Sequence, residues 1–426
     1  MKLENANPWW LNEPDPVLSE WNSHALKWTP AIATNLARYH LQGEFGLHFL
    51  TGPRQVGKTT ALHLFIHSLL EHRVDPNAIC YFQCDELLDF RELGDAIDAY
   101  LMIKKSRHIE HSALLFDEIT FVKDWWRAVK ARLDNKVLSN DTIIVTGSAS
   151  LDLLVQKERF PGRRGNGLDV TLYPLDFHQY ASLHVSGLVT SVLAKDSAVD
   201  TICMPNKLFT NRLDELFIRY LITGGFPAPI HEYNRAGTIS QATRGALLAW
   251  IKGDTQLAGK SNAYMKEVLQ YLLTARNSPI SWLSIAKNTS IRSPTTVVSY
   301  VDLLERLLLA KTLHLLDQQQ HVAYKRNKKV HFTDPFISRV LAGYTGVDLL
   351  DEDIVESIVA THLARKYPTY YWKDGSEIDA IALIDKVPVG FEVKYGNKQW
   401  KRVLHLSQQH LLNKPIIPTF LASVEW

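Results

Sequence analysis

The chain has 426 residues, enough for about two to four domains that each bury a core of their own. Its apolar, aromatic and charged fractions are those of an ordinary globular protein. Its formal net charge of +2 excludes a strong electrostatic field around the whole molecule. A nucleic-acid surface would therefore have to be a local patch. No apolar run reaches the length of a membrane span, and residues 1–10 lack the pattern of a signal peptide.

Cysteine usage predicts a reducing compartment. The three cysteines are Cys80, Cys84 and Cys203. They form no Cys-x-x-Cys pair and no disulfide framework. We expect Cys80 and Cys84 to be small apolar core residues on one face of a strand, and the protein to be cytoplasmic.

Residues 1–30 are distinguished by four tryptophans among scattered prolines: Trp9, Trp10, Trp21 and Trp28. The segment shows little periodicity, so we expect an irregular arm that packs on a neighbouring domain. The tryptophans are better explained as packing anchors than as a ligand cage.

A phosphate-binding loop is the clearest motif of the chain. Residues 52–60 have the form G-x-x-x-x-G-K-[ST] followed by a second threonine, between an apolar run at 47–50 and helical spacing from residue 61. A glycine loop between a strand and a helix directs backbone N–H groups at a phosphate. The predicted nucleotide-binding residues are Gly52, Pro53, Arg54, Gln55, Val56, Gly57, Lys58, Thr59 and Thr60. We expect Lys58 to reach the β- and γ-phosphates of ATP and Thr59 to bind Mg²⁺.

An acidic strand end follows. A second strand is expected at 78–82, and the apolar residues 113–116 lead into Asp117 and Glu118. Ligands of open parallel sheets bind at the carboxyl ends of the strands. We therefore expect Asp117 to hold Mg²⁺ and Glu118 to polarise the attacking water. The alternative is a strand that ends in two solvated acids.

Two further segments supply candidates for contact with the γ-phosphate. The apolar strand at 142–146 runs into Gly147 and Ser148, and either Thr146 or Ser148 could contact the phosphate or the water. A helix N-cap is the alternative role for Ser148. Residues 160–167 form a basic, glycine-rich loop in which Arg163 could stabilise transition-state charge; surface solvation explains it equally well.

The middle of the chain changes character twice. Residues 181–262 are expected to be mostly helical and without chemistry. Residues 263–325 predict three helices and a strand, as in a winged helix-turn-helix. The basic run at 325–329 could meet phosphates, although such modules often pack only against other domains.

The last segment predicts a hairpin with a charged face. Strands at 377–384 and 387–394 joined by a two-residue loop would place Asp379 opposite Glu392 and Glu377 opposite Lys394. Facing carboxylates repel, and a divalent cation would remove that repulsion. Lys394 could then orient a water, and Glu356 on the preceding helix could add a carboxylate. The alternative is a solvated face with an ordinary Glu377–Lys394 pair.

These segments together resemble the archaeal-type AAA+ ATPases, which have relatives in bacteria and carry a C-terminal region of unknown function. Beyond the phosphate loop and the acidic strand end, the resemblance rests on short motifs: Trp125-Trp126, Thr146-Gly147-Ser148, Gly162-Arg163, Gly224-Gly225-Phe226-Pro227, Phe332-Thr333-Asp334-Pro335, Tyr371-Trp372 and Glu392-Val393-Lys394. It covers the chain from about residue 31 onward.

The resemblance implies ATP hydrolysis through Lys58, Thr59, Asp117 and Glu118, with Arg163 as an arginine finger. Many bacterial relatives have glutamine where this chain has Thr120, so that position receives no role. The C-terminal region is similar to the PD-(D/E)xK nuclease fold, on whose signature Asp379, Glu392 and Lys394 fall. Many proteins with that fold bind without cutting.

The expected fold is α/β, with a parallel-sheet P-loop core, a helical connector with a winged helix, and a small nuclease-like domain. The expected domains are an arm at 1–30, an ATPase domain at 31–180, a helical connector at 181–262, a winged helix at 263–325 and a nuclease-like domain at 326–426. The expected function is an ATPase that uses ATP and Mg²⁺ and acts on nucleic acid, possible partners being DNA and further copies of the chain. The alternative is an ATP-controlled assembly whose C-terminal domains only bind a protein or DNA partner.

Overall fold

The computed structural model describes residues 3–147, 153, 158–185, 210–374, 376–395 and 417–419. The predictions for Ser148 and Cys203 lie outside these residues. The chain divides into two compact units, residues 1–173 and residues 174–426. Each unit is described by itself.

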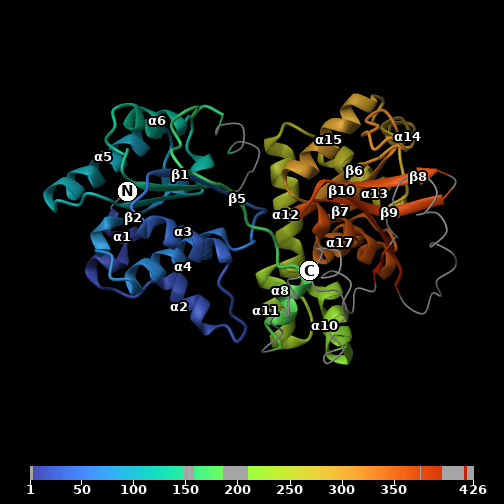
Figure 1. Cartoon of the computed structure of the whole chain (residues 1–426), viewed down its shortest axis with the longest axis horizontal. Helices are drawn as coiled ribbons and strands as arrows, with labels where there is room; N and C mark the ends of the chain where they lie inside the picture. The colour runs from blue at the N-terminus through green and yellow to red at the C-terminus, as the bar shows by residue number, and fades with distance from the viewer. Residues whose placement is uncertain are drawn as a thin grey trace. The chain divides into compact units, whose positions relative to one another are not determined.

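The N-terminal unit is built on a five-stranded sheet in the order β2-β3-β4-β1-β5, and every neighbouring pair is parallel (Figure 1). Its strands are β1 (Gly46–Thr51), β2 (Ile79–Gln83), β3 (Ala113–Asp117), β4 (Thr142–Thr146) and β5 (Asp169–Thr171). The larger helices are α3 (Ala31–Leu41), α4 (Lys58–Glu71), α5 (Phe90–Ser106) and α6 (Trp126–Asp134). The predicted α/β fold is confirmed, with β5 as an additional edge strand that the sequence did not indicate.

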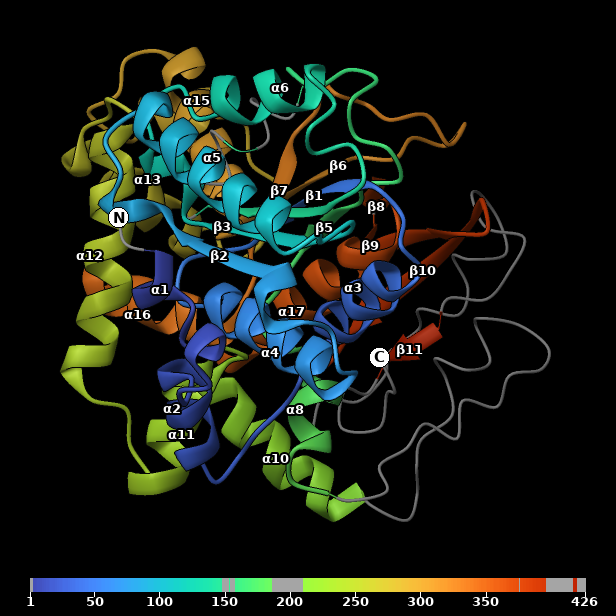
Figure 2. The same ribbon diagram turned by 90° about the vertical axis from the view of Figure 1, so that its left-hand side faces the viewer.

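Helices cover both faces of this sheet, because the buried strands are apolar on both sides. Alternate residues such as Leu114 and Phe116 of β3 pack with α5 and α6, and their neighbours Ala113 and Leu115 pack with α3 and α4. Figure 2 shows α5 and α6 on one side of the strands and α4 on the other. Cys80 and Cys84 are both buried in the cluster that includes α5 and α6, as expected, but Cys84 lies in the 3₁₀ turn η3 (Cys84–Glu86) and not in strand β2.

The N-terminal arm is helical, which corrects the expectation of an irregular segment. It contains α1 (Leu3–Ala6), the 3₁₀ turn η1 (Pro8–Leu11) and α2 (Pro16–Ser23). Proline begins η1 and α2, where its missing N–H costs nothing, and Asp15 caps α2 by accepting hydrogen bonds from two backbone N–H groups. Short capped helices leave few periods for a sequence pattern to show.

The arm packs on the outer edge of the sheet. The Asn7 side chain accepts a hydrogen bond from Tyr81 N (2.7 Å) and donates one to Tyr81 O (2.9 Å). The indole N–H groups of Trp9 and Trp10 both donate to Ile79 O, at 3.1 and 2.8 Å. These two tryptophans therefore act as anchors on strand β2.

The C-terminal unit combines helices with two small sheets. Its helices are α8 (Phe177–Ser182), α10 (Thr210–Thr223), α11 (Pro227–Ala236), α12 (Gln241–Leu257), α13 (Asn262–Thr274), α14 (Trp282–Lys287), α15 (Pro294–Arg306), α16 (Pro335–Thr345) and α17 (Asp351–Lys366). An antiparallel pair, β6 (Ala310–His314) and β7 (Lys328–Phe332), follows α15. Three helices followed by this pair match the element order expected of a winged helix, an identification that stays a prediction.

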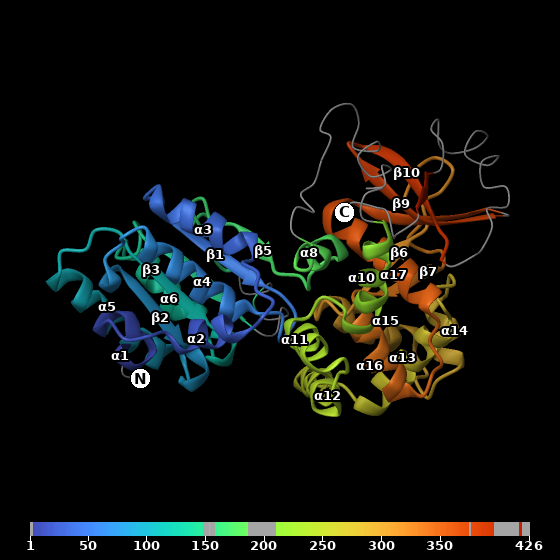
Figure 3. The same cartoon turned by 90° about the horizontal axis from the view of Figure 1, so that it is seen from below.

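The second sheet of this unit has the order β11-β10-β9-β8. Its strands are β8 (Thr369–Asp374), β9 (Ser376–Ile384), β10 (Val387–Val393) and β11 (Ile417–Thr419). Helix α17 packs against β9 and β10, beside which it lies in Figure 3. The predicted hairpin register is confirmed from the Ile384–Val387 pair to the Ala380–Phe391 pair, where the ladder ends before Asp379 and Glu392. Asp385 and Lys386 form its two-residue loop, and both have positive φ, as a type I′ turn requires.

The basic run does not lie on the surface as a whole. Lys325 and Arg326 are exposed, but Lys328 and Lys329 belong to β7 and are 7% and 1% exposed. The four cations among residues 325–329 were candidates for phosphate contact, and the strand buries two of them.

Candidate functional site

The phosphate loop connects β1 to α4 as predicted. The left-handed φ of Gln55 (62°) and Gly57 (98°) turns the chain into the first residue of α4. Gly52 allows a close approach, because a Cβ there would lie 2.5 Å from the carbonyl oxygen of Leu172. The loop thus has the tight path that leaves backbone N–H groups and the α4 N-terminus available to a phosphate.

Lys58 lies inside this loop. Its side chain is buried, and its ammonium donates to the carbonyl oxygens of Gly52 and Pro53, both at 3.1 Å. These two contacts hold the ammonium group at the loop.

Asp117 is held by three hydroxyl groups from three elements. Its Oδ2 accepts hydrogen bonds from Thr59 Oγ1 at 2.6 Å and from the Tyr81 phenol at 2.8 Å. Its Oδ1 accepts one from Thr146 Oγ1. Hydroxyl groups fix the orientation of a carboxylate and leave its negative charge in place. Adjacent hydroxyl and carboxylate oxygens are the ligands that Mg²⁺ prefers. Thr59 and Asp117 therefore fit the Mg²⁺ ion that the resemblance to AAA+ ATPases implies.

Tyr81 was not predicted as a site residue. It lies in the expected strand at 78–82 and shares the α4 side of the sheet with Leu115, its partner in β3. From there the long side chain reaches Asp117, two residues further along β3. Burial and the neighbouring Asp117 raise the pKa of this phenol far above its usual range, so it remains a donor. One sequence feature could have indicated this role: Tyr81 is a tyrosine near the carboxyl end of β2, and β2 is adjacent to β3, the strand that ends in Asp117.

Glu118 begins a turn rather than continuing β3. Its φ of 53° is left-handed, which is uncommon for a residue with a side chain, and its N–H donates to Thr146 Oγ1 at 3.1 Å. Its Oε2 is buried and has no hydrogen-bond partner among the described residues. Thr146 therefore contacts both acids of the pair, one through each hydrogen-bonding role of its hydroxyl.

Arg163 lies near the amino-terminal end of β1, whereas the phosphate loop follows the carboxyl-terminal end of that strand. The next residues, Arg164 and Gly165, contact the start of β1 at Leu47 and Gly46. The phosphate loop follows the end of β1, roughly 17 Å away at about 3.3 Å per residue. Arg163 itself pairs with Asp134, the last residue of α6. It cannot reach a nucleotide on its own loop.

The C-terminal constellation contains the predicted residues and one that was not predicted. Lys394 pairs with Glu392, and Asp379 Oδ2 accepts a hydrogen bond from Val393 N at 2.8 Å. The unpredicted residue is Lys329, whose ammonium lies 2.9 Å from Glu356 Oε1, 2.6 Å from Glu377 Oε1 and 3.5 Å from Asp379 Oδ1. The local pattern around Lys329 does not indicate this contact, because it does not show that β7 buries this side chain.

Electrostatics in this cluster follow from burial and from Lys329. Burial raises the pKa of Glu356 to about 7, with Lys329 working against the shift. Burial also raises the pKa of Glu392, helped by the charge of Asp379. Glu377 behaves in the opposite way: burial opposes its ionisation, but Lys329 and Lys373 outweigh burial and lower its pKa.

Two of the short motifs of the C-terminal unit meet in a structural contact. Asp334 Oδ2 accepts a hydrogen bond from Gly225 N, and its Oδ1 caps α16 at Phe336 N, each at 2.8 Å. A Cβ at Gly224, whose φ is 58°, would lie 2.0 Å from Asp334 Oδ1. These residue types are required for packing.

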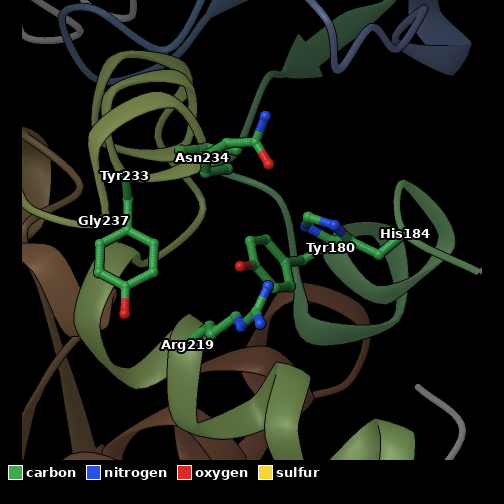
Figure 4. Close-up of a pocket in the computed structure, with 7 residues that line it drawn as sticks. Tyr180, His184, Arg219, Tyr233, Asn234 and Gly237 are labelled. Carbon is green, nitrogen blue, oxygen red and sulfur yellow. The ribbon is translucent and has the colours of Figure 1, made fainter.

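A separate cavity of ≈ 250 Å³ lies within the C-terminal unit (Figure 4). Its lining includes Tyr180, His184, Arg219 and Tyr233, and none of the predicted site residues. Burial lowers the pKa of His184, and Arg219 adds to the shift. No described contact points to a ligand there.

The fold and the loop together define the class of the N-terminal unit: a P-loop domain with strand order β2-β3-β4-β1-β5 and an acidic pair at the end of β3. Residues 44–181 match the family model described as an AAA domain, so this part of the chain is an AAA domain. The resemblance to the AAA+ ATPases is thereby confirmed over that range. Residues 214–348 match a family described as a domain of unknown function, DUF8612.

Relatives and solved structures add little on function. The chain is 24% identical over 361 residues to uncharacterized proteins of Mycobacterium tuberculosis (Rv2008c) and Mycobacterium bovis (Mb2031c), covering 81% of this chain and 69% of each relative. Among solved structures, it is similar to the Aeropyrum pernix ORC2 protein (TM-score 0.42, 10% identity, 74% of this chain and 93% of that one). It is also similar to the Thermotoga maritima RuvB branch migration motor (TM-score 0.30, 14% identity, 66% and 86%). TM-scores this low carry no functional conclusion.

In the part of the chain that the structure describes, no helix is both long and apolar enough to cross a lipid bilayer.

Proposed function

We propose that the N-terminal unit binds ATP with Mg²⁺ and hydrolyses it, and that the chain uses this cycle as a switch that acts on nucleic acid. The observation that carries the ATPase proposal is the 2.6 Å contact between Thr59 Oγ1 and Asp117 Oδ2 beside a complete phosphate loop. The match to an AAA domain over residues 44–181 supports it independently.

The residues divide the work as follows. Lys58 would exchange the carbonyls of Gly52 and Pro53 for β- and γ-phosphate oxygens, and Thr59 and Asp117 would hold Mg²⁺. The metal, when bound, supplies positive charge to the phosphates. Glu118 would orient the attacking water in line with the γ-phosphate, using the buried oxygen that has no described partner.

Arg163 would act only across a subunit boundary. Its place beside the start of β1 and its pairing with Asp134 fit a residue that meets a neighbouring copy rather than its own nucleotide. Unchanged ATP hydrolysis by an Arg163→Ala variant in the assembled protein would refute this role and leave Arg163 as a solvated surface residue.

The decisive variant for the ATPase is Glu118→Gln. It removes the water-orienting carboxylate and keeps the phosphate cradle, so we expect turnover to fall roughly 100-fold or more while ATP binding persists. Phosphate release and binding of a fluorescent ATP analogue would be measured side by side. Glu110→Gln, at an exposed acid, is the matched control and should change neither. Full turnover in Glu118→Gln would refute the assignment.

Nucleic-acid contact is proposed for the loop between β6 and β7. Lys325 and Arg326 are exposed there, next to the helices and strand pair expected of a winged helix. Replacing both with alanine should weaken binding to DNA and reduce the salt dependence by about one phosphate contact per side chain lost. Fluorescence anisotropy with single- and double-stranded DNA would test this. The control pair is Lys105→Ala with Arg107→Ala, two exposed cations at the end of α5. An equal loss of DNA affinity in the two double variants would refute a dedicated DNA-binding surface at Lys325 and Arg326.

A second candidate function is supported by the cluster around Lys329. In it ATP controls assembly, and the C-terminal domains bind a partner without cutting. Plasmid and single-stranded DNA would be incubated with Mg²⁺ or Mn²⁺ and either the unaltered chain or an Asp379→Ala, Lys394→Ala variant. Cutting that disappears in the variant would establish a nuclease; absence of cutting with ATPase intact would favour the binding module.

A further inference from the structure

Lys329 is the most enclosed charged group of the C-terminal cluster. Its side chain is 1% exposed, and it extends from β7 into the space between α17 and β9. There its ammonium contacts carboxylates from both elements: Glu356 of α17, and Glu377 and Asp379 of β9. One buried cation thus ties three elements that are separate in the sequence.

Two more lysines offset part of the remaining negative charge. Lys394 pairs with Glu392 at the end of β10, and Lys373 donates to Glu377 Oε2 at 2.8 Å. The four carboxylates of the cluster, Glu356, Glu377, Asp379 and Glu392, are therefore faced by three ammonium groups. The repulsion that made a divalent cation attractive in the hairpin is already offset by side chains.

Most of the donor oxygens are also engaged by other groups, and Glu392 Oε2 is buried without a hydrogen-bond partner among the described residues. A divalent cation needs several oxygens at 2.0–2.6 Å that converge on one point, at about the distances typical of Mg²⁺ and Ca²⁺. Here Glu356 Oε1 and Asp379 Oδ1 face the Lys329 ammonium, and Asp379 Oδ2 accepts from Val393 N. Among the described residues, no group of three or more His, Cys, Asp or Glu is arranged to hold a metal ion. The cluster as it stands does not fit a metal.

We propose that the Lys329 ammonium takes the place of the divalent cation in this nuclease-like domain. The domain then keeps the signature carboxylates as an internal ion cluster that joins β7, α17 and β9, and it does not cleave phosphodiesters by a metal-dependent route. Its contribution to the chain is binding. This inference is independent of the proposed ATPase, since it concerns only the C-terminal unit.

The experiment measures Mn²⁺ binding to the nucleotide-free full chain carrying Asp117→Asn, which silences the expected cation site of the N-terminal unit. Electron paramagnetic resonance would count bound Mn²⁺. With Lys329 present, we expect no bound ion at low millimolar Mn²⁺. Lys329→Met, which keeps the length and removes the charge, should gain one bound ion, and adding Asp379→Asn should abolish it.

The control is Lys328→Met, at the neighbouring lysine whose ammonium donates to Arg326 O at 2.7 Å. It should gain no ion. A bound Mn²⁺ in the chain with Lys329 intact, lost on Asp379→Asn, would overturn the proposal. So would a folded Lys329→Met chain that binds none.

If Lys329→Met does not fold, the measurement with Lys329 present still decides between the two readings. Circular dichroism with and without Mn²⁺ adds a second readout, because restored folding of the Lys329→Met chain by Mn²⁺ also supports the proposal.

Discussion

The two units hold their clustered carboxylates in different ways. In the N-terminal unit the partners of Asp117 are hydroxyl groups, from Thr59, Tyr81 and Thr146. In the C-terminal unit the partners of Glu356 and Asp379 include the ammonium of Lys329. Hydroxyl donors orient a carboxylate and preserve its charge for an incoming cation, whereas an ammonium group neutralises it. Acidic residues at the end of a strand therefore do not define a metal site until the charge of their partners is known.

The largest expected effect comes from exchanging one carboxylate for an amide in each unit. Asp117→Asn should lower Mg²⁺-dependent ATP turnover roughly 100-fold, the lower end of what a positioned catalytic group contributes. Asp379→Asn is the matched change and should leave turnover within about twofold, since Asp379 belongs to the other unit and its described contacts are with Lys329 and Val393. Steady-state phosphate release at saturating ATP measures both. Comparable losses would show that the two clusters are not distinct in function.

Tyr81→Phe tests the hydroxyl partners specifically. Loss of one hydrogen bond to a charged group corresponds to about 1.5–3 kcal/mol, so the Mg²⁺ concentration for half-maximal turnover should shift roughly 10-fold. The ring, and with it the packing, is kept. Tyr100→Phe is the control, because Tyr100 donates to the carbonyl of Asn77 and not to an acid. A shift in kcat with an unchanged Mg²⁺ requirement would count against a role in holding Asp117.

The smallest expected effect is on how the stability of the C-terminal unit depends on pH, through Glu377 and its lysine partners. Burial opposes ionisation of Glu377, but Lys329 and Lys373 outweigh it and lower the pKa of this acid. A folded pKa below the unfolded value favours folding above about pH 4.3, and this stability is lost as pH falls through the folded pKa. Glu377→Gln should therefore flatten the acid limb of the stability curve of the C-terminal unit. Urea unfolding from pH 3 to pH 7 would measure it, with Glu352→Gln as a partly exposed acid of α17 for comparison; parallel curves would contradict the assignment.

Patterns close in sequence predicted the N-terminal unit well. The loop motif and the strand ends placed Lys58, Thr59, Asp117 and Thr146 together, because parallel strands bring their carboxyl ends to one edge. The two-residue loop at Asp385 and Lys386 likewise fixed the hairpin register, since a period of two leaves no freedom once the turn is set.

Contacts distant in sequence could not be predicted in the same way. Tyr81 reaches Asp117 only because β2 and β3 are adjacent, and Lys329 reaches Glu356 only because β7 packs on α17. Nothing in their local patterns separates them from a core aromatic or a surface lysine. Neighbouring charge, which decides what each cluster can do, is a property of tertiary packing.

The arm on strand β2 has a consequence for self-association. An edge strand presents unpaired backbone groups that can pair with a strand of another molecule. Asn7 occupies both the N–H and the carbonyl of Tyr81, and Trp9 and Trp10 occupy the carbonyl of Ile79. A chain begun at residue 31 would leave those groups open and, by this account, would form sheet-mediated oligomers that the arm prevents.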